Sequence, residues 1–505
     1  MALLQLLKQS SKLFYLSSSF LLLAIISLKY VFRKRKLSYP PSPPKLPFIG
    51  NLHQLGAMPH VSLQRLGEKY GPIFSLKLGQ IPTVVVSSPR LAKEALKTHD
   101  LAFASRPQLL SAKGLFYGCT DMAFAPYGAY WRGIRKICIL EVLSARKVQS
   151  IRFVREEEVG RLVNRVAESF PGTTNLSKLL GLYANDILCR VVLGKTYSDG
   201  GEYDRHGFKK MLDDYQELLG GFSLGDYFPS LEFVHNFTSM KSKLDSTFKR
   251  FDQFFDEVIS EHLSPGRKTT ENKDLVDVLL DIQRSESAET PLTMDNVKAN
   301  MLVMFAAGTD TTFITLDWAM TELMMNTKIM EKAKAEVRNI VGEKRYVQES
   351  DLHHMHYMKA IIKEVLRLHP PAPVSVPRES LEDVTMEGYK IPAKTRIYVN
   401  VYAIARDPTV WENPDKFDPE RFMGSSIDYK GQDFELLPFG AGRRICPGLM
   451  FAAAAVELAF AQLLHSFDWE LPPGVKPQDI DNTEAFGITM HRMVPLRVIS
   501  RPRFG

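Results

Sequence analysis

The sequence predicts a mainly α-helical protein with small β-sheets and an N-terminal transmembrane anchor. Helical spacing of apolar residues dominates from about residue 90, with few convincing strands before about residue 384. The first 36 residues hold an apolar run that ends in a basic cluster. Near the C-terminus, a glycine-rich loop with one cysteine precedes a long alanine-rich run with helical spacing. These three observations favour one large helical body held near a membrane.

The N-terminal segment carries the whole charge excess of the protein. The chain has a formal net charge of +7, and residues 1–36 contain seven Lys or Arg side chains and no acidic residue. The rest of the chain is therefore neutral overall. This removes the support for a nucleic-acid partner and leaves a membrane as the expected contact.

Residues 13–32 approach the roughly 20 apolar residues that span a bilayer, with Lys29 reaching the interface. A cleaved signal peptide is the alternative, but no small-residue cleavage site precedes the basic cluster. Because the basic flank at 33–36 outweighs the lysines before the apolar run, the following domain is predicted to face the cytosol. We therefore expect a single-pass anchor in the endoplasmic reticulum membrane, with the sequons at Asn175 and Asn236 unused.

Two features follow the anchor. A proline-rich stretch at residues 37–50 predicts a stiff, extended hinge, because proline fixes φ and lacks an N–H group. Residues 73–78 and 82–86 are rich in β-branched and apolar side chains and predict a small hairpin.

The glycine-rich loop from Pro438 to Gly448 reads PFGAGRRICPG and holds Cys446. The four cysteines of the chain form no C-x-x-C pair, which fits a reducing compartment. Glycines let such a loop turn sharply and approach a flat ligand. A helix that begins after Cys446 would favour a thiolate through its N–H groups and dipole, and a thiolate can bind haem iron. A small buried thiol is the alternative interpretation.

The pattern F-x-x-G-x-R-x-C-x-G is complete in this loop, at Phe439, Gly442, Arg444, Cys446 and Gly448. It resembles the haem-binding loop of the cytochromes P450. The resemblance implies heme b (iron protoporphyrin IX) with the Cys446 thiolate as the axial ligand of the metal.

The resemblance runs from about residue 40 to the C-terminus and implies one domain of the cytochrome P450 fold. The expected organisation is therefore a membrane anchor with a basic flank at 1–36, the hinge at 37–50 and a haem-thiolate monooxygenase domain at 51–505.

Trp131 and Arg135 lie one helical turn apart, so the indole and the guanidinium share a helix face. Such a pair is most often a packing feature. In the family that the chain resembles, the matching residues bind a haem propionate, and Arg378 and Arg444 are further partners. With Phe439 and Cys446 they form the expected cofactor site.

The run 301–316 has helical spacing, yet Gly308 and four threonines are poor residues for a helix interior. A core helix that tolerates one glycine is the structural alternative. The functional interpretation is that Gly308 and Thr311 open the i→i−4 ladder and admit dioxygen and water. The sequence AGTDTT at 307–312 resembles the oxygen-activation motif of the cytochromes P450. This implies catalytic roles in proton delivery for Thr311 and Asp310.

Glu364 and Arg367 form an E-x-x-R pair on a predicted helix. Such pairs are commonly solvated and contribute only ~0.2–0.5 kcal/mol. With Arg421 they match a buried triad that supports the haem loop in the resembled family, and we expect that structural role here.

The residues of these motifs are most similar to those of plant microsomal enzymes of specialised metabolism. The implied activity is hydroxylation or another oxidation of a small lipophilic metabolite, such as a terpenoid, phenolic or alkaloid, with dioxygen. Electrons must come from a partner, because the chain has no G-x-G-x-x-G nucleotide motif. NADPH–cytochrome P450 reductase is the implied partner, and cytochrome b5 is a second candidate. The basic side chains of Arg132, Lys136 and Arg443 either receive the reductase or form a solvated face.

The family's pocket regions contain apolar residues, which favour a lipophilic substrate. The residues expected to line the pocket are Phe305, Ala307, Val374, Val376, Phe486 and Ile488. One alternative function is a haem-thiolate isomerase or dehydratase that needs no dioxygen; Asp310 and Thr311 count against it. The other is a non-catalytic membrane haem-binding protein, which would more often use two side-chain ligands.

Overall fold

The computed structural model describes residues 39–198, 207–267, 273–285, 289–485 and 487–504. Two predictions fall outside the described residues: the membrane anchor at 1–36 and the pocket residue Phe486.

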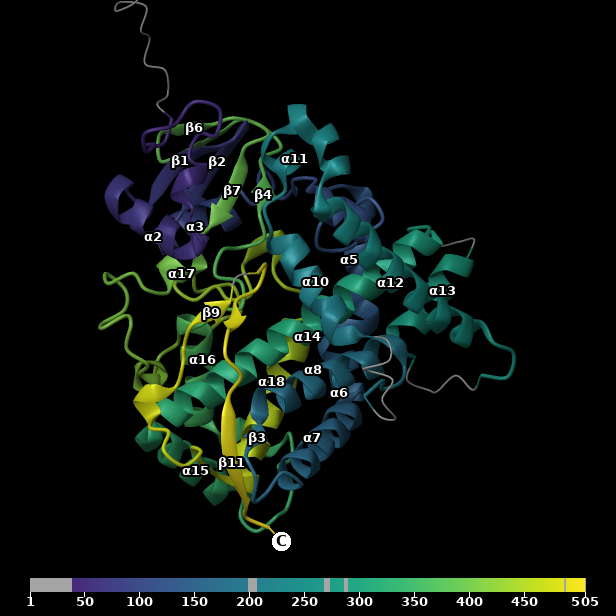
Figure 1. Cartoon of the computed structure of the whole chain (residues 1–505), viewed down its shortest axis with the longest axis vertical. Helices are drawn as coiled ribbons and strands as arrows, with labels where there is room; N and C mark the ends of the chain where they lie inside the picture. The colour runs from purple at the N-terminus through teal and green to yellow at the C-terminus, as the bar shows by residue number, and fades with distance from the viewer. Residues whose placement is uncertain (1–38, 199–206, 268–272, 286–288, 486, 505) are drawn as a thin grey trace, which may run out of the picture.

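The predicted helical class is confirmed, and the fold is organised around one long central helix (Figure 1). Helix α14 (Met294–Met325) packs against α8 (Leu176–Leu193), α16 (His356–Leu368) and α18 (Leu449–Ser466). It begins at a capping box, in which Thr293 and Asn296 each accept a hydrogen bond from the other's backbone N–H. Because α14 is apolar on all sides, it is stable only when other helices surround it.

The remaining helices surround this centre or connect to it. The α-helices are α2 (Pro59–Tyr70), α3 (Pro89–Lys93), α4 (Leu110–Leu115), α5 (Ala129–Cys138), α6 (Ala145–Ser150), α7 (Arg152–Ala167), α10 (Phe208–Gly220), α11 (Leu224–Tyr227), α12 (Ser239–Leu263), α13 (Leu275–Arg284), α15 (Thr327–Val341) and α17 (Val401–Ile404). The short 3₁₀ and π segments are η1 (Leu52–Gln54), η2 (Glu94–Thr98), η3 (Ile139–Leu143), η5 (Pro229–Phe237), η6 (Asp351–His354), η7 (Pro419–Phe422), η8 (Gly442–Arg444) and η9 (Pro477–Asp479).

Small β-sheets form the rest of the fold. The largest has the order β1–β2–β7–β4, and its first two strands are the predicted hairpin. Strand β7 pairs in parallel with β2, so Thr83 lies opposite Arg396 although more than 300 residues separate them. The strands are β1 (Ile73–Leu78), β2 (Ile81–Val86), β3 (Thr174–Asn175), β4 (Arg378–Glu379), β5 (Val384–Met386), β6 (Tyr389–Ile391), β7 (Arg396–Val399), β8 (Phe467–Glu470), β9 (Glu484–Ala485), β10 (His491–Arg492) and β11 (Arg497–Pro502).

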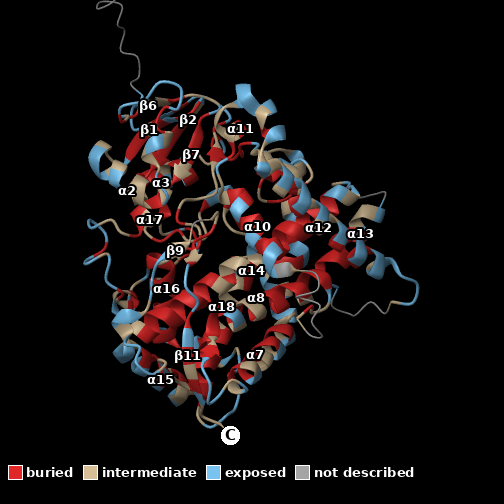
Figure 2. Cartoon of the chain, in the orientation of Figure 1, coloured by how far each residue is buried: buried red, intermediate tan, exposed pale blue. Residues whose placement is uncertain are grey.

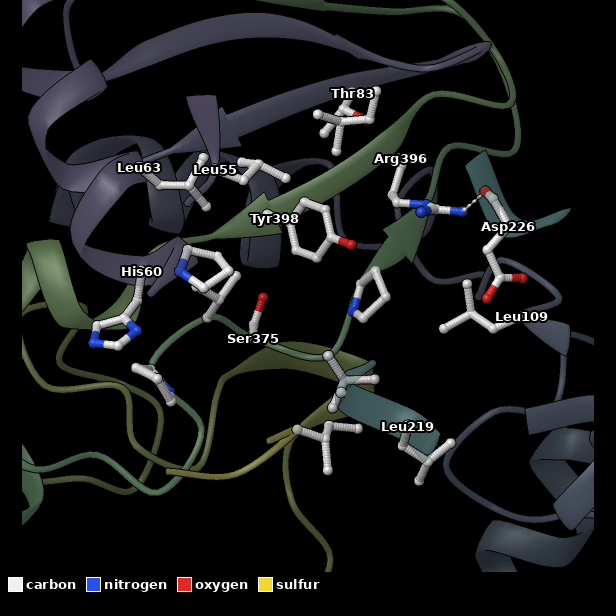
Figure 3. Close-up of a pocket in the computed structure, with 18 of the residues that line it drawn as sticks. Leu55, His60, Leu63, Thr83, Leu109, Leu219, Asp226, Ser375, Arg396 and Tyr398 are labelled. Carbon is white, nitrogen blue, oxygen red and sulfur yellow. Dashed lines mark hydrogen bonds between the residues drawn. The ribbon is translucent and has the colours of Figure 1, made fainter. Parts of the chain in front are cut away.

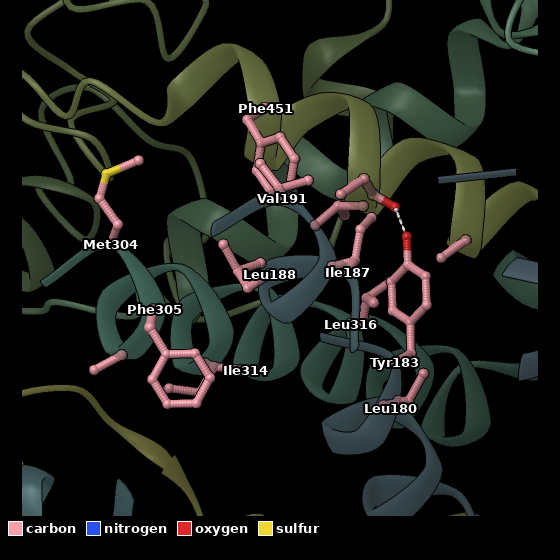
Figure 4. Close-up of a cluster of buried hydrophobic side chains, with 14 of the residues drawn as sticks. Leu180, Tyr183, Ile187, Leu188, Val191, Met304, Phe305, Ile314, Leu316 and Phe451 are labelled. Atoms are coloured by element: carbon pink, nitrogen blue, oxygen red, sulfur yellow. Dashed lines mark hydrogen bonds between the residues drawn. The ribbon is translucent and has the colours of Figure 1, made fainter. Parts of the chain in front are cut away.

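The core is continuous through the helical body, where Figure 2 shows buried residues along α14, α16 and α18. Figure 4 shows its centre, where the Tyr183 hydroxyl of α8 donates to the Ala455 carbonyl of α18 across 2.9 Å. Among the described residues, α18 alone is long and apolar enough to cross a membrane, and 72% of it is buried inside the protein. It is therefore a core helix of this fold.

The proline-rich hinge packs against the first sheet. The carbonyl of Pro41 accepts a hydrogen bond from the Ser75 backbone N–H at 2.7 Å, and the Asn51 side chain donates to the carbonyl of Pro44 at 3.1 Å. Residues 40–51 are thus held on β1 and fix where the chain enters the domain.

Candidate functional site

The cysteine loop is a tight turn between η8 and α18. The Cys446 backbone N–H donates to the Phe439 carbonyl across 2.9 Å, which closes the loop on itself. Gly442 has a φ of +70°, and a Cβ at this position would lie 2.1 Å from the carbonyl oxygen of Leu96. Only glycine fits there, so this part of the motif has a steric cause.

The surroundings of Cys446 have opposing effects on the pKa of its thiol. Burial raises the pKa of this thiol, whereas the N–H groups of Gly448 and Leu449 and the Arg135 guanidinium lower it. Burial is the larger effect, so the pKa is raised overall. Coordination to a metal cation deprotonates a thiol, so this environment is compatible with the expected thiolate ligand.

Four arginine side chains gather beside this loop, from four separate segments. They are Arg106, Arg135, Arg378 and Arg444. Burial lowers the pKa of Arg444 to about 9, with further lowering by Arg378 and Arg135. Burial likewise lowers the pKa of Arg378 to about 10, although Asp100 lies 3.5 Å away.

This buried positive charge is only partly compensated by protein groups. Arg444 donates to the carbonyls of Ala104 and Ala125, each at 2.7 Å, and Arg106 donates to the carbonyls of Val376 and Pro377. Buried cations are unfavourable unless an anion accompanies them. The residues present therefore fit a buried group with two carboxylates, which is what the haem propionates provide.

Trp131 stacks on two of these guanidiniums. The Arg444 guanidinium carbon lies 4.0 Å and that of Arg135 lies 5.5 Å from the indole ring centre. The indole N–H donates to the Met122 carbonyl at 3.0 Å. The cation–π contacts orient the two guanidiniums, and the propionate contact of Trp131 stays a prediction.

The oxygen-activation stretch lies within an unbroken helix. Thr311 donates its hydroxyl hydrogen to the Ala307 carbonyl at 2.8 Å. The structure shows no opening of the hydrogen-bond ladder at Gly308, contrary to expectation. The glycine has a packing cause: a Cβ there would lie 2.7 Å from the Leu188 side chain of α8.

Asp310 is held by two side chains that belong to none of the predicted motifs. Gln216 of α10 donates to its carboxylate at 2.7 Å, and the Thr489 hydroxyl donates to the same oxygen. Burial raises the pKa of Asp310, and the hydrogen bond from Thr489 offsets part of this. A carboxyl group with a raised pKa is suited to carrying a proton.

The E-x-x-R pair and Arg421 meet as a buried triad. Arg367 forms two hydrogen bonds to Glu364, at 2.7 and 2.8 Å, and Arg421 donates to Glu364 at 3.0 Å. Glu364 and Arg367 have no exposed surface. Arg367 also donates to the carbonyls of Ala405 and Pro414, so the triad fastens α16 to the segment that leads to the cysteine loop.

A cavity of about 170 Å³ lies between the helical body and the first sheet (Figure 3). Three of the predicted pocket residues line it: Val374, Val376 and Ile488. Further apolar wall residues are Leu109, Phe124 and Leu219. A cavity of comparable size, about 150 Å³, holds a benzene-sized group.

Two predicted pocket residues lie elsewhere. Phe305 is fully buried in the core, in the α8–α14 cluster of Figure 4, and does not line the cavity. Ala307 is exposed on α14 and is also not part of the cavity wall. Helical spacing alone did not reveal which side of α14 meets α8 and which side stays open.

The three basic residues considered for reductase docking are exposed. Lys136 pairs with Glu289 at 2.7 Å, and Arg443 pairs with Asp100 at 3.2 Å. The guanidinium of Arg132 lies over the Tyr127 ring at 5.6 Å. Each therefore already has a partner within the protein.

Comparisons with known proteins identify the family of the chain. The cytochrome P450 family model matches residues 40–494. Cytochrome P450 71AP13 of Prunus mume is 68% identical over 508 residues, covering 100% of this chain and 98% of the relative. Strychnine-11-hydroxylase of Strychnos nux-vomica is 47% identical, covering 92% and 91%. A solved zebrafish cytochrome P450 with abiraterone is 27% identical, with a TM-score of 0.74 over 88% of this chain and 100% of that one.

The chain therefore belongs to the cytochrome P450 family, which is a class of haem-thiolate oxidoreductases. Its relatives place it, more narrowly, among the plant monooxygenases of the CYP71 clan.

Proposed function

We propose that this protein holds heme b through the Cys446 thiolate and oxidises a small lipophilic plant specialised metabolite, with dioxygen and electrons from NADPH–cytochrome P450 reductase. The observation that carries the proposal is the meeting of Cys446 with four arginine side chains, three of which are buried, and whose positive charge is only partly compensated by acidic residues. No other cysteine among the described residues lies in such a loop.

When bound, a haem with a thiolate ligand supplies the activation of dioxygen. The residues of this chain do the rest. The arginine cluster would hold the propionates of this group. Asp310 carries protons to the Thr311 hydroxyl, and the apolar wall of the cavity excludes water and orients the substrate.

The names of two relatives support the substrate class. Strychnine-11-hydroxylase is 47% identical to this chain, and phenylacetaldehyde oxime monooxygenase CYP71AN24 of Prunus mume is 44% identical. Their names describe an alkaloid and an oxime, which are small molecules with large apolar parts. The apolar residues of the cavity wall favour contact with the apolar parts of such compounds.

The dependence of turnover on reductase and NADPH separates this proposal from its alternatives. A monooxygenase needs both, an isomerase or dehydratase turns over without them, and a non-catalytic haem protein forms no product. Substrate candidates are found by adding fractions of a plant metabolite extract to the purified protein and recording spin-state shifts of the Soret band.

We expect Thr311→Ala to uncouple NADPH consumption from product formation. The hydroxyl both donates and accepts hydrogen bonds, and its loss removes one group from the proton path. The productive step should slow by roughly 10- to a few hundred-fold, the scale of one positioned proton-transfer group, while hydrogen peroxide replaces product. The measurement is product formed per NADPH consumed.

Thr321→Ala is the matched control for Thr311→Ala. Thr321 makes the same type of bond, to the Asp317 carbonyl at 2.7 Å, but lies ten residues further along α14. Its variant should keep the native ratio of product to NADPH. An unchanged ratio in Thr311→Ala would assign Thr311 a packing role only.

We also propose that residues 1–36 anchor the protein in the endoplasmic reticulum membrane with the catalytic domain in the cytosol. An exposed apolar surface supports this. Phe48 in the hinge is 92% exposed and Phe237 in η5 is 86% exposed. Hydrogen bonds from the β1–β2 turn join these two segments, because the Gly79 backbone N–H donates to the Ile49 carbonyl and the Gln80 side chain donates to the Ser230 hydroxyl of η5 at 2.6 Å. Apolar patches of this kind commonly meet a membrane or a partner.

Protease added to intact microsomes is expected to digest the catalytic domain, because the positive-inside rule leaves it outside the lumen. Asn236 is the better glycosylation reporter of the two sequons. Its side chain is exposed, whereas Asn175 caps α8 and pairs with β11. Protection from protease, or a glycan on Asn236, would reverse the proposed topology.

A further inference from the structure

One end of the cavity carries a buried positive charge that the mechanism does not use. Arg396 of β7 lines this end and is only 5% exposed (Figure 3). Its neighbours on the wall are Thr83, Asp226, Tyr227 and Tyr398. Much of the remaining wall is apolar, with His60 and Ser375 as further polar side chains, so Arg396 is the arginine that a ligand in the cavity would meet.

The hydrogen bonds of Arg396 are incomplete. One terminal nitrogen donates to the Asp226 carbonyl at 3.2 Å, and the guanidinium lies 5.6 Å from the Tyr227 ring centre. A side-chain hydrogen bond with Tyr398 also helps to raise the pKa of Arg396. The Nε atom is buried and has no hydrogen-bond partner. An arginine has five N–H donors, so this side chain retains unused donor capacity.

Nearby acids do not neutralise Arg396 by direct contact. Within the described parts of the chain, no carboxylate lies within 4.0 Å of its guanidinium. The Asp226 carboxylate instead accepts the Leu110 backbone N–H at 2.7 Å. Burial lowers the pKa of Arg396, but Tyr398, Tyr227 and Asp226 raise it by more, so the side chain stays charged.

The cavity connects this charge with the proposed haem site. Val376 and Pro377 form part of its wall and directly precede Arg378, one of the proposed propionate partners. In the pairing of β4 with β7, Arg396 lies opposite Glu379, the residue that follows Arg378. A polar group of a ligand held by Arg396 would help to set which carbon of the molecule faces the haem.

We propose that Arg396 binds a hydrogen-bond-accepting oxygen of the substrate, a carbonyl or a carboxylate. This rests on the proposed monooxygenase function and narrows its substrate class to lipophilic molecules with a terminal oxygen acceptor. A site with a buried donor discriminates strongly against analogues that lack the acceptor, because the donor is then left unpaired.

The test uses imidazole probes with alkyl tails of increasing length. The imidazole binds the haem iron and shifts the Soret band, and the tail ends in a methyl group, a methyl ketone or a carboxylate. At one tail length, the full-length native protein should bind a ketone or carboxylate probe about 10- to 100-fold more tightly than the methyl-ended probe, the scale of a hydrogen bond to a charged group.

Arg396→Met should abolish this preference and leave the affinity for the methyl-ended probe unchanged, because the methionine keeps an apolar stem of similar length. Arg396→Lys should retain part of the preference for the carboxylate. A preference for the carboxylate identifies an anionic acceptor. A preference for the ketone alone identifies a neutral one, because Asp226 repels an anion; either result supports the proposal.

Two results would overturn the proposal: no preference at any tail length in the native protein, or a preference that persists in Arg396→Met. Arg396→Met could fail to fold because α11 has lost its contact with the arginine. The first result needs no variant, so it would still test the proposal in that case. If no probe shifts the Soret band at all, the proposed haem site itself fails. The two failures are therefore distinguishable.

Discussion

Cys446→Ala is expected to eliminate the red-shifted Soret band of the reduced, carbon monoxide-bound protein. That band reports a thiolate ligand to haem iron, and alanine offers no ligand atom. Any haem that the arginine cluster retains should show an unshifted band, and turnover with NADPH and reductase should be abolished. The measurement is the carbon monoxide difference spectrum of the purified protein.

Cys138→Ala is the matched control for this experiment. Cys138 is fully buried in α5, near Arg135, and burial raises the pKa of its thiol to about 12. It remains a protonated thiol packed in the core, so its removal should leave the Soret band in place. Persistence of the band in Cys446→Ala, or its loss in Cys138→Ala, would show that Cys446 is not the iron ligand.

The parts of the site that could be predicted from sequence are those with short, fixed spacing. The loop around Cys446 and the E-x-x-R pair each lie within about a dozen residues, so steric demands such as that of Gly442 are visible in the sequence. The mainly helical fold could be predicted for a similar reason, because a repeat of 3.6 residues is local.

The parts that could not be predicted arise from contacts between distant segments. Gln216 and Thr489 lie 94 and 179 residues from Asp310, which they hold, and neither belongs to a recognisable motif. Arg106 joins the arginine cluster from outside every predicted motif. The polar end of the cavity likewise depends on the parallel pairing of Thr83 with Arg396. No local sequence pattern predicts this pairing.

Some expectations differ from the structure because a local pattern has more than one physical cause. Gly308 is expected to loosen α14, but it allows close approach of Leu188. Phe305 was expected in the pocket, but it faces the core. In each case the residue type is compatible with both roles, and only packing decides between them.

Glu364→Ala is expected to cause the largest loss of stability among the site variants. The Glu364 carboxylate accepts hydrogen bonds from Arg367, Arg421 and the Asp418 backbone N–H, and it has no exposed surface. Its removal leaves the buried Arg367 guanidinium without its counter-ion. Breaking a buried ion pair in this way costs about 3–5 kcal/mol, a large share of a typical stability of about 5–15 kcal/mol.

The variant should therefore give far less folded haem protein. The remaining protein should unfold at a markedly lower denaturant concentration, and the loss of the carbon monoxide band measures this unfolding. Asp213→Ala is the control, because the Lys209–Asp213 pair has a similar length, 2.8 Å, but both of its side chains are largely exposed. Water already screens that pair, so its loss should barely move the midpoint. If the two variants unfold at the same denaturant concentration, the triad does not stabilise the segment before the cysteine loop.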